Sequence, residues 1–560
     1  MYLLKKLGFY FIILIPVIIF YGIFYKYSVN IPINDDYAIL DFLNKIISTD
    51  SVYEKIKLIF AQHNEHRIVY DRIWALISYK LSQQVNFNIL ALIGNLSLIP
   101  IFIIFAKKTQ ELNKNLIYLI PISVLIFNIT FYENMTFAMA TLSNLTVFVF
   151  SLLSIHFFTK IDLSNKNLTL AITFFVFATL TQGSGLFLIP IGLIILLYKK
   201  DRKKLLIFTV FSLIVVALYF YGYNKPPSSP SLLTTLLDFK IKTILFVFAF
   251  LGNAFDYNLI FTKELEDSVG ITTILGFLFF LIYLNTIKTK YYKKNLFNFT
   301  VISLIILTGF ITGVTRSQLG LDTAASSRYR INGIILIIGI YIWFIETNTI
   351  KQKYLIYVSI GLTSFCYLMF FSLRQEEYLS FRKKQSMTGV LHYFSGDHTK
   401  LNGFEQDLYK KILIESQSKQ TYFLPNFETL DSFFPYSKIE KIVQTDANSE
   451  QFYPTIDAVA KIKEGYLIEG WGFVEEQNSD NQKVFIGIKN TSQTEPVFFT
   501  TNQVPRFDLN PFFKKNYIEN AGFFARLKDN DVKPGENEIW VMIKVNDKVK
   551  LSKTDKKLIK

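Results

Sequence analysis

Residues 8–26 read GFYFIILIPVIIFYGIFYK, an apolar run, and residues 31–37 just beyond it read IPINDDY. A helix needs ~20 apolar residues to cross a bilayer, and no small-residue cleavage site follows this run. We therefore expect a retained signal anchor, with Asp35 and Asp36 directly outside the membrane. Charges are costly there and tend to be kept for function. The alternative is that one aspartate caps a helix that begins near Tyr37.

Similar runs recur through the first 372 residues. Hydrophobic residues make up 51% of the 560 positions and 56 residues are Phe, and the mean hydropathy is +0.31. These values exclude an ordinary soluble protein and predict a polytopic α-helical membrane protein. The run 167–198 is too long for one span and breaks at 182–185, which predicts two short helices. We expect eleven full spans, within a range of 11 to 13: 8–26, 87–106, 116–135, 139–158, two within 167–198, 205–223, 269–287, 296–314, 331–347 and 354–372.

Lysine-rich loops set the orientation, because basic loops stay in the cytoplasm. Their positions place 27–86, 130–138, 181–185, 224–268 and 315–330 outside. Residues 240–255 are apolar, but a full crossing there would move the basic loop 288–295 outside. We therefore expect 240–255 to be re-entrant or interfacial. The net charge of +15 reflects these lysines and a basic tail, and no stripe typical of nucleic-acid binding is present.

The composition changes after residue 372. Residues 373–450 carry mixed charge with helical periodicity, which predicts a helical linker region. Residues 451–560 contain short strand-like stretches separated by turn-rich segments, which predicts a small β-sandwich outside the membrane. The expected layout is thus a membrane domain (1–372), this linker and the β-sandwich. Trp471 and Phe473 there either stack on sugar rings or belong to the core; a tryptophan inside a strand favours the core.

The first outer loop, 27–86, carries a polar cluster of His63, Glu65, His66 and Arg67. On a helix, His63 and Arg67 would share a face. The two histidines and Glu65, with the acidic pair, could ligate a divalent metal. They could instead bind a polyol while arginine attracts an anion. A solvated helix carrying ion pairs is the remaining alternative.

A second polar cluster lies in the predicted outer loop 315–330, with Arg316, Arg328, Tyr329 and Arg330. Arginines outside the membrane run against the positive-inside rule. Because guanidinium matches phosphate oxygens in bidentate geometry, we interpret them as phosphate ligands. Snorkelling to lipid headgroups is the alternative.

This arrangement resembles the GT-C glycosyltransferases, polytopic enzymes that use polyprenyl-phosphate-linked sugars. The matching features are Asp35 and Asp36 after the first span, the first outer loop, the late outer 327–329 (Ser-Arg-Tyr) and an outer C-terminal domain. It is especially similar to bacterial members that end in a small β domain, where 506–508 (Arg-Phe-Asp) and 521–523 (Ala-Gly-Phe) look familiar. The architecture matches over the whole chain, but the motifs are short.

The resemblance implies sugar transfer at the outer face of a bacterial cytoplasmic membrane, to a glycan, lipid or protein acceptor. Asp35 or Asp36 would be the catalytic base. Arg328 would bind the donor phosphate, helped by Arg316, Arg330 and Tyr329, and the histidine cluster would bind substrate. Some members of the class need a divalent metal and others do not, and the sequence leaves this open.

Other functions compete with this one. An envelope polysaccharide polymerase or ligase would depend on outer arginines and histidines more than on an acidic pair. A transporter of lipid-linked sugars should show internal repeats and mid-membrane charges, which the sequence does not display. A scaffold for envelope assembly is a further alternative.

Overall fold

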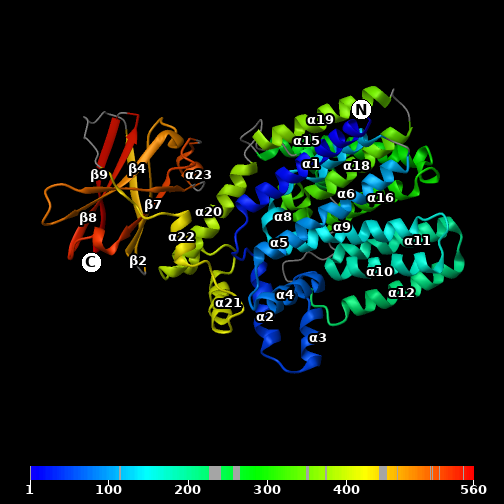
Figure 1. Ribbon diagram of the computed structural model, residues 1–560, viewed down its shortest axis with the longest axis horizontal. Coiled ribbons are helices and arrows are strands. Elements are labelled where there is room, and N and C mark those ends of the chain that lie inside the picture. Colours follow the sequence, from blue (N-terminus) through cyan, green and yellow to red (C-terminus); the bar gives the residue numbers. More distant parts are fainter. Residues whose placement is uncertain are drawn as a thin grey trace. The chain divides into compact units, whose positions relative to one another are not determined.

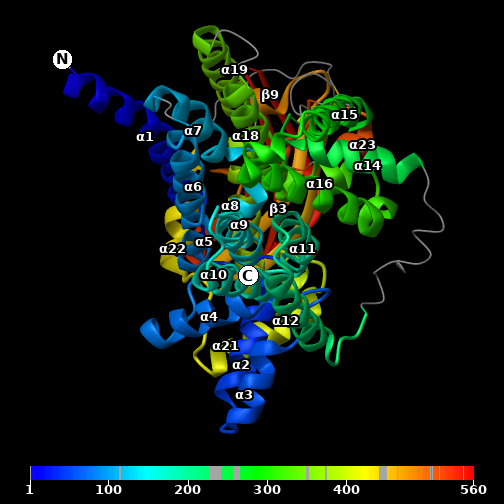
Figure 2. The same ribbon diagram turned by 90° about the vertical axis from the view of Figure 1, so that its right-hand side faces the viewer.

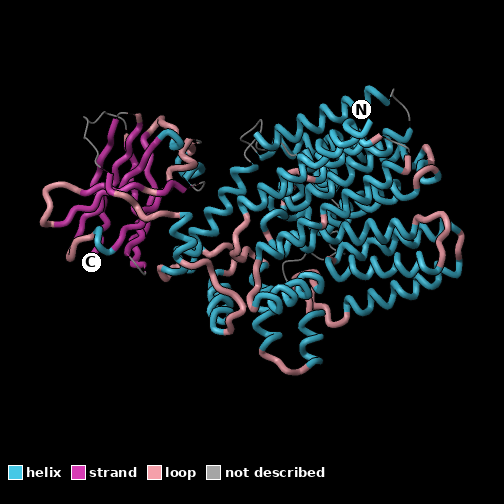
Figure 3. The backbone as a smooth tube through the Cα atoms, viewed as in Figure 1, coloured by secondary structure: helices cyan, strands magenta, loops and turns pink. Residues whose placement is uncertain are grey.

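The fold comes from a computed structural model that describes residues 2–560 except 113–114, 226–240, 256–264, 348–351, 373–374, 441–450, 463–464, 505, 507–508, 516 and 547. The chain forms two compact units. Unit 1 comprises Met1–Ser380 and Lys411–Phe423, and unit 2 comprises Phe381–Lys410 and Leu424–Lys560. Unit 1 is helical, whereas unit 2 contains the two β-sheets (Figures 1 and 3).

Unit 1 is built mainly from long apolar helices. Asparagine, serine or aspartate side chains cap several of them: Asn86 accepts from the N–H of Ile89 (3.2 Å), and Asn295 from that of Asn298 (3.0 Å). The helices are α1 (Tyr2–Tyr27), α2 (Asp36–Ile47), α3 (Val52–Phe60), α4 (Val69–Ser82), α5 (Phe87–Leu96), α6 (Leu98–Gln110), α7 (Ile120–Ile126), α8 (Tyr132–Thr136), α9 (Ala138–Phe158), α10 (Asn165–Thr181), α11 (Leu188–Lys199), α12 (Arg202–Phe220), α14 (Ile241–Gly252), α15 (Leu265–Lys288), α16 (Leu296–Arg316), α17 (Asp322–Ala325), α18 (Arg330–Thr347) and α19 (Gln352–Ser372).

Eight helical stretches among the described residues are long and apolar enough to cross a membrane. They correspond to eight of the eleven predicted spans: Lys6–Tyr27, Phe87–Gln110, Leu116–Thr136, Ala138–Phe158, Arg202–Phe220, Gly270–Lys288, Leu296–Leu319 and Ser327–Thr347. The break predicted at 182–185 is present, but α10 and the stretch Gly183–Lys199 are shorter than these eight. The predicted span 354–372 lies within α19, of which Ile356–Phe365 is an apolar stretch among the described residues. The apolar helices thus indicate an integral membrane protein.

Helix α14 covers most of the segment predicted to be re-entrant. Its 12 residues are too few to cross a bilayer. It packs closely on α15, because a Cβ at Gly252 or Gly276 would collide with backbone atoms of the other helix. Small residues allow such close approach. Whether α14 dips into the membrane stays a prediction.

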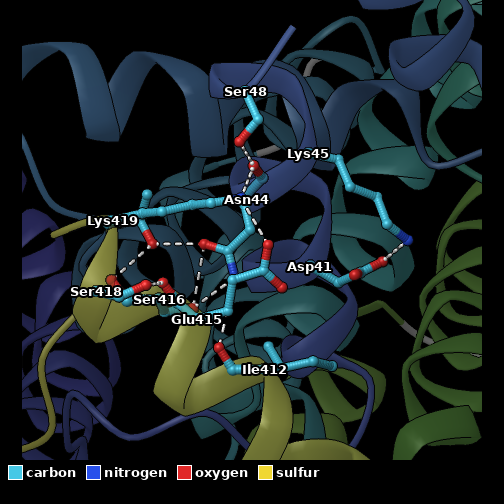
Figure 4. Close-up of polar contacts among 10 residues, drawn as sticks. Asp41, Asn44, Lys45, Ser48, Ile412, Glu415, Ser416, Ser418 and Lys419 are labelled. Atoms are coloured by element: carbon cyan, nitrogen blue, oxygen red, sulfur yellow. Dashed lines mark hydrogen bonds and ion pairs between the residues drawn. The ribbon is translucent and has the colours of Figure 1, made fainter.

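Residues 411–423, far along the chain, return to the first outer loop. Asn44 of α2 is fully buried, and its Nδ2 donates to the hydroxyl of Ser416 in α21 (Gln406–Ser418) at 2.9 Å (Figure 4). Lys419 Nζ donates to the carbonyl of Asn44 (2.9 Å), and the Tyr422 hydroxyl donates to the carbonyl of Asn30 (2.7 Å). The chain on both sides of Asp35 and Asp36 is therefore anchored.

Unit 2 contains two antiparallel sheets in the orders β1-β5-β4-β8-β9 and β2-β3-β7-β6. Their inner faces share one core, which includes Ile468 from one sheet and Ile486 and Val541 from the other. The predicted strands are present. The elements are α20 (Gln375–Phe394), α22 (Phe427–Phe433), α23 (Leu509–Phe513), β1 (Ile439–Glu440), β2 (Phe452–Ile462), β3 (Gly465–Val474), β4 (Gln482–Asn490), β5 (Val497–Thr500), β6 (Asn502–Val504), β7 (Gly522–Lys528), β8 (Glu536–Val545) and β9 (Lys548–Ile559).

Trp471 and Phe473 of β3 lie on the outer face of the smaller sheet, opposite the face that Ile468 presents to the shared core. Phe473 is fully buried, and Trp471 is partly buried. The ring of Phe513 in α23 packs 5.1 Å from Phe473 and 5.4 Å from Trp471. This small aromatic cluster favours the core interpretation over sugar stacking.

Candidate functional site

Asp36 is a buried carboxylate with both oxygens engaged. It is 1% exposed and accepts hydrogen bonds from the N–H of Ile33 (3.1 Å) and of Met139 (2.9 Å). Met139 lies in the first turn of α9, so Asp36 satisfies a backbone donor at the start of another helix. Burial raises the pKa of Asp36 to about 7, and the charge of Asp35 adds to this while the backbone donors oppose it. Asp36 therefore joins the first outer loop to α9.

Asp35, one residue earlier, has a different environment. It is the N-cap residue of α2, but its side chain makes no capping hydrogen bond. The carboxylate is 46% exposed, and its Oδ1 lies 3.6 Å from Nε2 of His63. Burial raises the pKa of Asp35, but His63, the positive charge of Arg328 and Asn64 outweigh it, so the pKa lies below its usual value. Asp35 is thus an accessible carboxylate that is ionised at neutral pH.

The histidine cluster forms a tight turn and not a helix. His63 and His66 exchange backbone hydrogen bonds of 2.8 Å, and Asn64 between them adopts φ = 47°. Asparagine tolerates this left-handed conformation better than most residues. The conditional prediction that His63 and Arg67 share a helix face is therefore wrong, since α3 ends at Phe60 and α4 starts at Val69.

His66 lies against the glycine-containing segment that precedes α11. A Cβ on Gly183 would be 2.8 Å from His66 Nδ1 and 2.8 Å from the Tyr219 hydroxyl, so only glycine fits there. Burial lowers the pKa of His66 to about 4, which keeps the ring neutral at pH 7. His66 Nδ1 is buried without a hydrogen-bond partner among the described residues. Its ring is held by packing, close to the polar turn.

Two predicted site residues from distant parts of the chain meet in an ion pair. Arg316, at the end of α16, lies 3.1 Å from Oε1 of Glu65, and both side chains are partly exposed. This contact brings the loop 315–330 to the histidine turn. The sequence predicted both clusters but gave no reason to pair them.

Two other predicted arginines hold backbone carbonyls. Arg67 donates to the carbonyls of Tyr219 (2.6 Å), Tyr221 (2.5 Å) and Phe60, which ties the loop to the end of α12. Arg330 is 4% exposed and donates to the carbonyls of Ala325 (3.2 Å) and Thr130 (3.1 Å). These contacts position the outer loops, so neither guanidinium is available to a ligand in the way the sequence suggested.

Arg328 is the exposed cation of the second cluster. Its guanidinium lies 5.5 Å from the ring centre of Tyr329 and makes no hydrogen bond or ion pair with any residue that the structure describes. After His63, its positive charge contributes to holding the pKa of Asp35 below its usual value. Unit 1 thus carries an accessible arginine whose charge acts on an accessible, ionised carboxylate.

Glu133 fixes the backbone of Arg328, a role that the sequence did not indicate. Its Oε2 accepts from the Ser327 hydroxyl (2.8 Å) and from the N–H of Arg328 (3.1 Å). The Asn134 side chain donates to the carbonyl of Arg328 (2.9 Å). A carboxylate and an amide on α8 therefore determine where this arginine stands.

A chain of neutral polar side chains continues from Asn134 to the histidine turn. Asn144 donates to Asn134 Oδ1 (2.9 Å), Gln182 donates to Asn144 Oδ1 (2.6 Å), and Ser184 donates to Gln182 Oε1 (2.9 Å). These residues lie on α8, α9 and the turn after α10. No local pattern marks them in the sequence, because their partners are 2 to 38 positions away. They make the site rich in amide groups that suit sugar hydroxyls.

The first outer loop contains a second buried carboxylate, Asp71 of α4. Asp71 is fully buried, and the Ser143 hydroxyl donates to it at 3.0 Å. Burial raises the pKa of Asp71 well above its usual value, although Ser143 and the charge of Arg72 oppose this. The hydrogen bond between Asp71 and Ser143 thus joins α4 to α9.

Among the residues that the structure describes, no three His, Cys, Asp or Glu side chains are grouped closely enough to hold a metal ion. Comparison with known proteins adds no identity: no family model, no curated protein and no solved structure matches this chain.

Proposed function

We propose that this protein is a membrane glycosyltransferase that moves a sugar from a polyprenyl-phosphate donor to a hydroxyl acceptor at the outer face of the membrane. The observation that carries the proposal is the pair formed by Asp35 and Arg328. One is an exposed, ionised carboxylate, and the other is an exposed arginine whose charge lowers the pKa of that carboxylate. Transfer from a sugar phosphate needs a base and a cation at neighbouring positions.

In the proposed reaction, the acceptor oxygen bonds to the anomeric carbon of the donor sugar. The bond from that carbon to the phosphate oxygen breaks, and the electron pair leaves with the polyprenyl phosphate. Asp35 takes the proton of the acceptor hydroxyl. Arg328 stabilises the negative charge that develops on the phosphate, because guanidinium binds phosphate oxygens in bidentate fashion. A protonated Asp35, a glycosylated acceptor and a polyprenyl phosphate result.

The remaining site residues have distinct roles in this proposal. Arg316, paired with Glu65, supplies a second cation whose charge is partly neutralised. His63 holds Asp35 in its ionised form. The amide chain from Asn134 to Ser184 offers neutral donors and acceptors for sugar hydroxyls. Asp36, Arg67 and Arg330 maintain the geometry.

Two helices of the first outer loop suggest that the site lies at headgroup depth. In α3 no residue is buried, and α4 exposes apolar side chains at every fourth position. Helices α2 and α3 run across the direction of the long helices and form one edge of unit 1 (Figures 1 and 2). Exposed apolar stripes with flanking lysines are typical of helices that lie in the membrane interface. The stripes comprise Val52, Tyr53, Ile56 and Phe60 in α3, and Ile73, Ile77 and Leu81 in α4.

The test measures surface-glycan composition in a deletion strain that re-expresses the wild type or a variant at matched membrane levels. We expect one sugar to disappear with the gene, and Asp35→Asn and Arg328→Ala to fail to restore it. Asp50→Asn is the matched control, because Asp50 is an exposed carboxylate of the same loop, outside the site.

Two results would contradict the proposal. Unchanged glycan composition in the deletion strain would favour a transporter or scaffold. If Asp35→Asn and Asp36→Asn each restored the missing sugar fully, neither aspartate would be the catalytic base. A polymerase or ligase would then be favoured.

A further inference from the structure

A cationic band crosses the outer face of the five-stranded sheet in unit 2. Because successive residues of a strand alternate between faces, Lys483 and Lys489 of β4 lie on the same face. Lys483 is in register with Lys544 of β8, and Lys489 with Glu538. The next pairs on this face are Trp540 with Lys553, and Glu538 with Lys557. The band therefore holds five lysines.

Two of the five lysines are neutralised by glutamates on β8. Lys553 pairs with Glu538 (2.5 Å) and Lys557 with Glu536 (2.6 Å). The other three, Lys483, Lys489 and Lys544, make no hydrogen bond or ion pair with any residue in the described part of the chain. Lys489 lies opposite Glu538 and, after Lys553, contributes to lowering the pKa of that glutamate.

The pairing of Lys483 with Lys544 costs stability. Like charges placed directly opposite each other on neighbouring strands repel. The apolar core on the inner face of the sheet stabilises the fold against this repulsion. A bound anion would remove the repulsion.

The centre of the band is aromatic. Trp540 is partly exposed, and it packs beside Phe498 over Gly487, where a Cβ would lie 2.8 Å from Phe498 and 3.0 Å from Trp540. The flat indole of Trp540 can stack on a sugar ring. The lysines on either side of it can pair with acidic groups of the same polymer. The lysines at the two ends of the band lie six residues apart on β4, about 20 Å at the rise of a strand. That length suits an extended polymer better than a small ion.

A lipid surface is disfavoured as the partner of this face. Phe485, Phe498, Met542 and Val549 form its apolar cluster, and all four are buried. Interfacial membrane binding normally inserts exposed apolar side chains. On this face the described large apolar side chain that is markedly exposed is Ile559, which lies at the end of the edge strand β9, away from Trp540.

We infer that this face binds an anionic polysaccharide, with Lys483, Lys489 and Lys544 contacting its acidic groups and Trp540 contacting a sugar ring. The inference concerns unit 2 alone and does not rest on the proposed glycosyl transfer.

The test measures binding of polygalacturonate, a polymer of uronic acid, to the full-length protein in nanodiscs of zwitterionic lipid. Dextran is the neutral polysaccharide control. We expect polygalacturonate to bind, dextran not to bind, and the variant Lys483→Gln/Lys489→Gln/Lys544→Gln to bind roughly tenfold or more weakly. Lys483→Arg, which keeps the charge, should bind like the wild type.

The matched control carries Lys514→Gln, Lys533→Gln and Lys556→Gln, which remove the same charge from exposed positions outside the band. Equal weakening in both triple variants would show a net-charge effect and overturn the inference. The inference would also be overturned if the protein did not bind polygalacturonate, or if it bound anionic vesicles alone. The single variant Lys483→Gln repeats the measurement if the triple variant is poorly folded. Binding is read without any transfer reaction, so its failure and that of the proposed function are distinguishable.

Discussion

The first outer loop and the outer face of the five-stranded sheet both carry many charges, but they use them in opposite ways. In the loop, adjacent residues differ completely: Asp36 is buried with two backbone donors, whereas Asp35 is exposed beside His63. On the sheet, Lys483 and Lys489 lie six positions apart on one strand and share one face, although one is opposite Lys544 and the other opposite Glu538. An irregular backbone makes each position unique, while a regular strand makes positions equivalent.

The contrast predicts how substitutions should behave. Single changes in the loop should have large and unequal effects, because each side chain has its own partners. Single changes on the sheet should have small and nearly additive effects, because separate exposed charges act independently. The predictions below run from the largest expected effect to the smallest.

Asp35→Asn should lower the rate of sugar transfer by about 10²–10⁴-fold, the usual contribution of a positioned general base. The measurement is release of polyprenyl phosphate from a sugar-linked donor by protein in nanodiscs. Thermal unfolding should stay near that of the wild type, because the Asp35 side chain makes no capping bond. If Asp35→Asn kept full activity, Asp35 would not be the general base.

Arg328→Ala should lower the same rate by about 10²–10³-fold through lost stabilisation of the leaving phosphate. Arg328→Lys should recover part of the loss, since lysine keeps the charge but not the bidentate geometry. Arg202→Ala is the control, an arginine at the start of α12. If Ala and Lys variants were equally active, Arg328 would be a lipid anchor instead.

Asp36→Asn should destabilise the protein by about 1–3 kcal/mol, because one of two buried backbone donors loses its acceptor. Thermal unfolding in detergent measures this. Since the pKa of folded Asp36 is raised to about 7, its contribution to wild-type stability is fully present below pH 3.8 and falls as pH rises toward 7. The variant should lose this pH dependence. Unchanged stability would mean that Asp36 does not hold α9.

His63→Asn should move the acidic limb of the pH–rate profile to higher pH. His63 lowers the pKa of Asp35, so its loss raises that pKa, and Asp35 then becomes protonated at a higher pH. The rate at neutral pH should change little. The same shift should be absent in Asn86→Ala, a cap variant outside the site. A profile that moves to lower pH would contradict the assigned pair.

Lys483→Gln, Lys489→Gln and Lys544→Gln, made singly, should each weaken polygalacturonate binding by about 1.5- to 5-fold, the effect of 0.2–1 kcal/mol. Raising the salt concentration should reduce all three effects together, because exposed charges are screened. If a single lysine accounted for most of the binding, the three positions would not be equivalent. The sheet would then resemble the first outer loop, where each side chain has its own role.

Local sequence signals predicted the elements better than the site. Apolar length located eight spans, and short strand-like stretches between turn-rich segments located the strands of unit 2. The same signals located the break between α10 and α11 and the helix α19, which contains the predicted span 354–372. The helical alternative for the histidine cluster failed because Asn64 adopts a left-handed conformation that residue spacing does not reveal.

By itself the sequence determined that the chain is a membrane protein with a separate β region, and that charges cluster in the segments 27–86 and 315–330. These properties follow from composition and periodicity, which act over a few neighbouring residues. Only the tertiary structure decided that Asp35 is exposed and Asp36 buried, that Arg328 is accessible while Arg67 and Arg330 hold carbonyls, and that Glu133 positions Arg328. Those outcomes depend on contacts between segments up to 200 residues apart, as for Arg330 and Thr130, which no local pattern encodes.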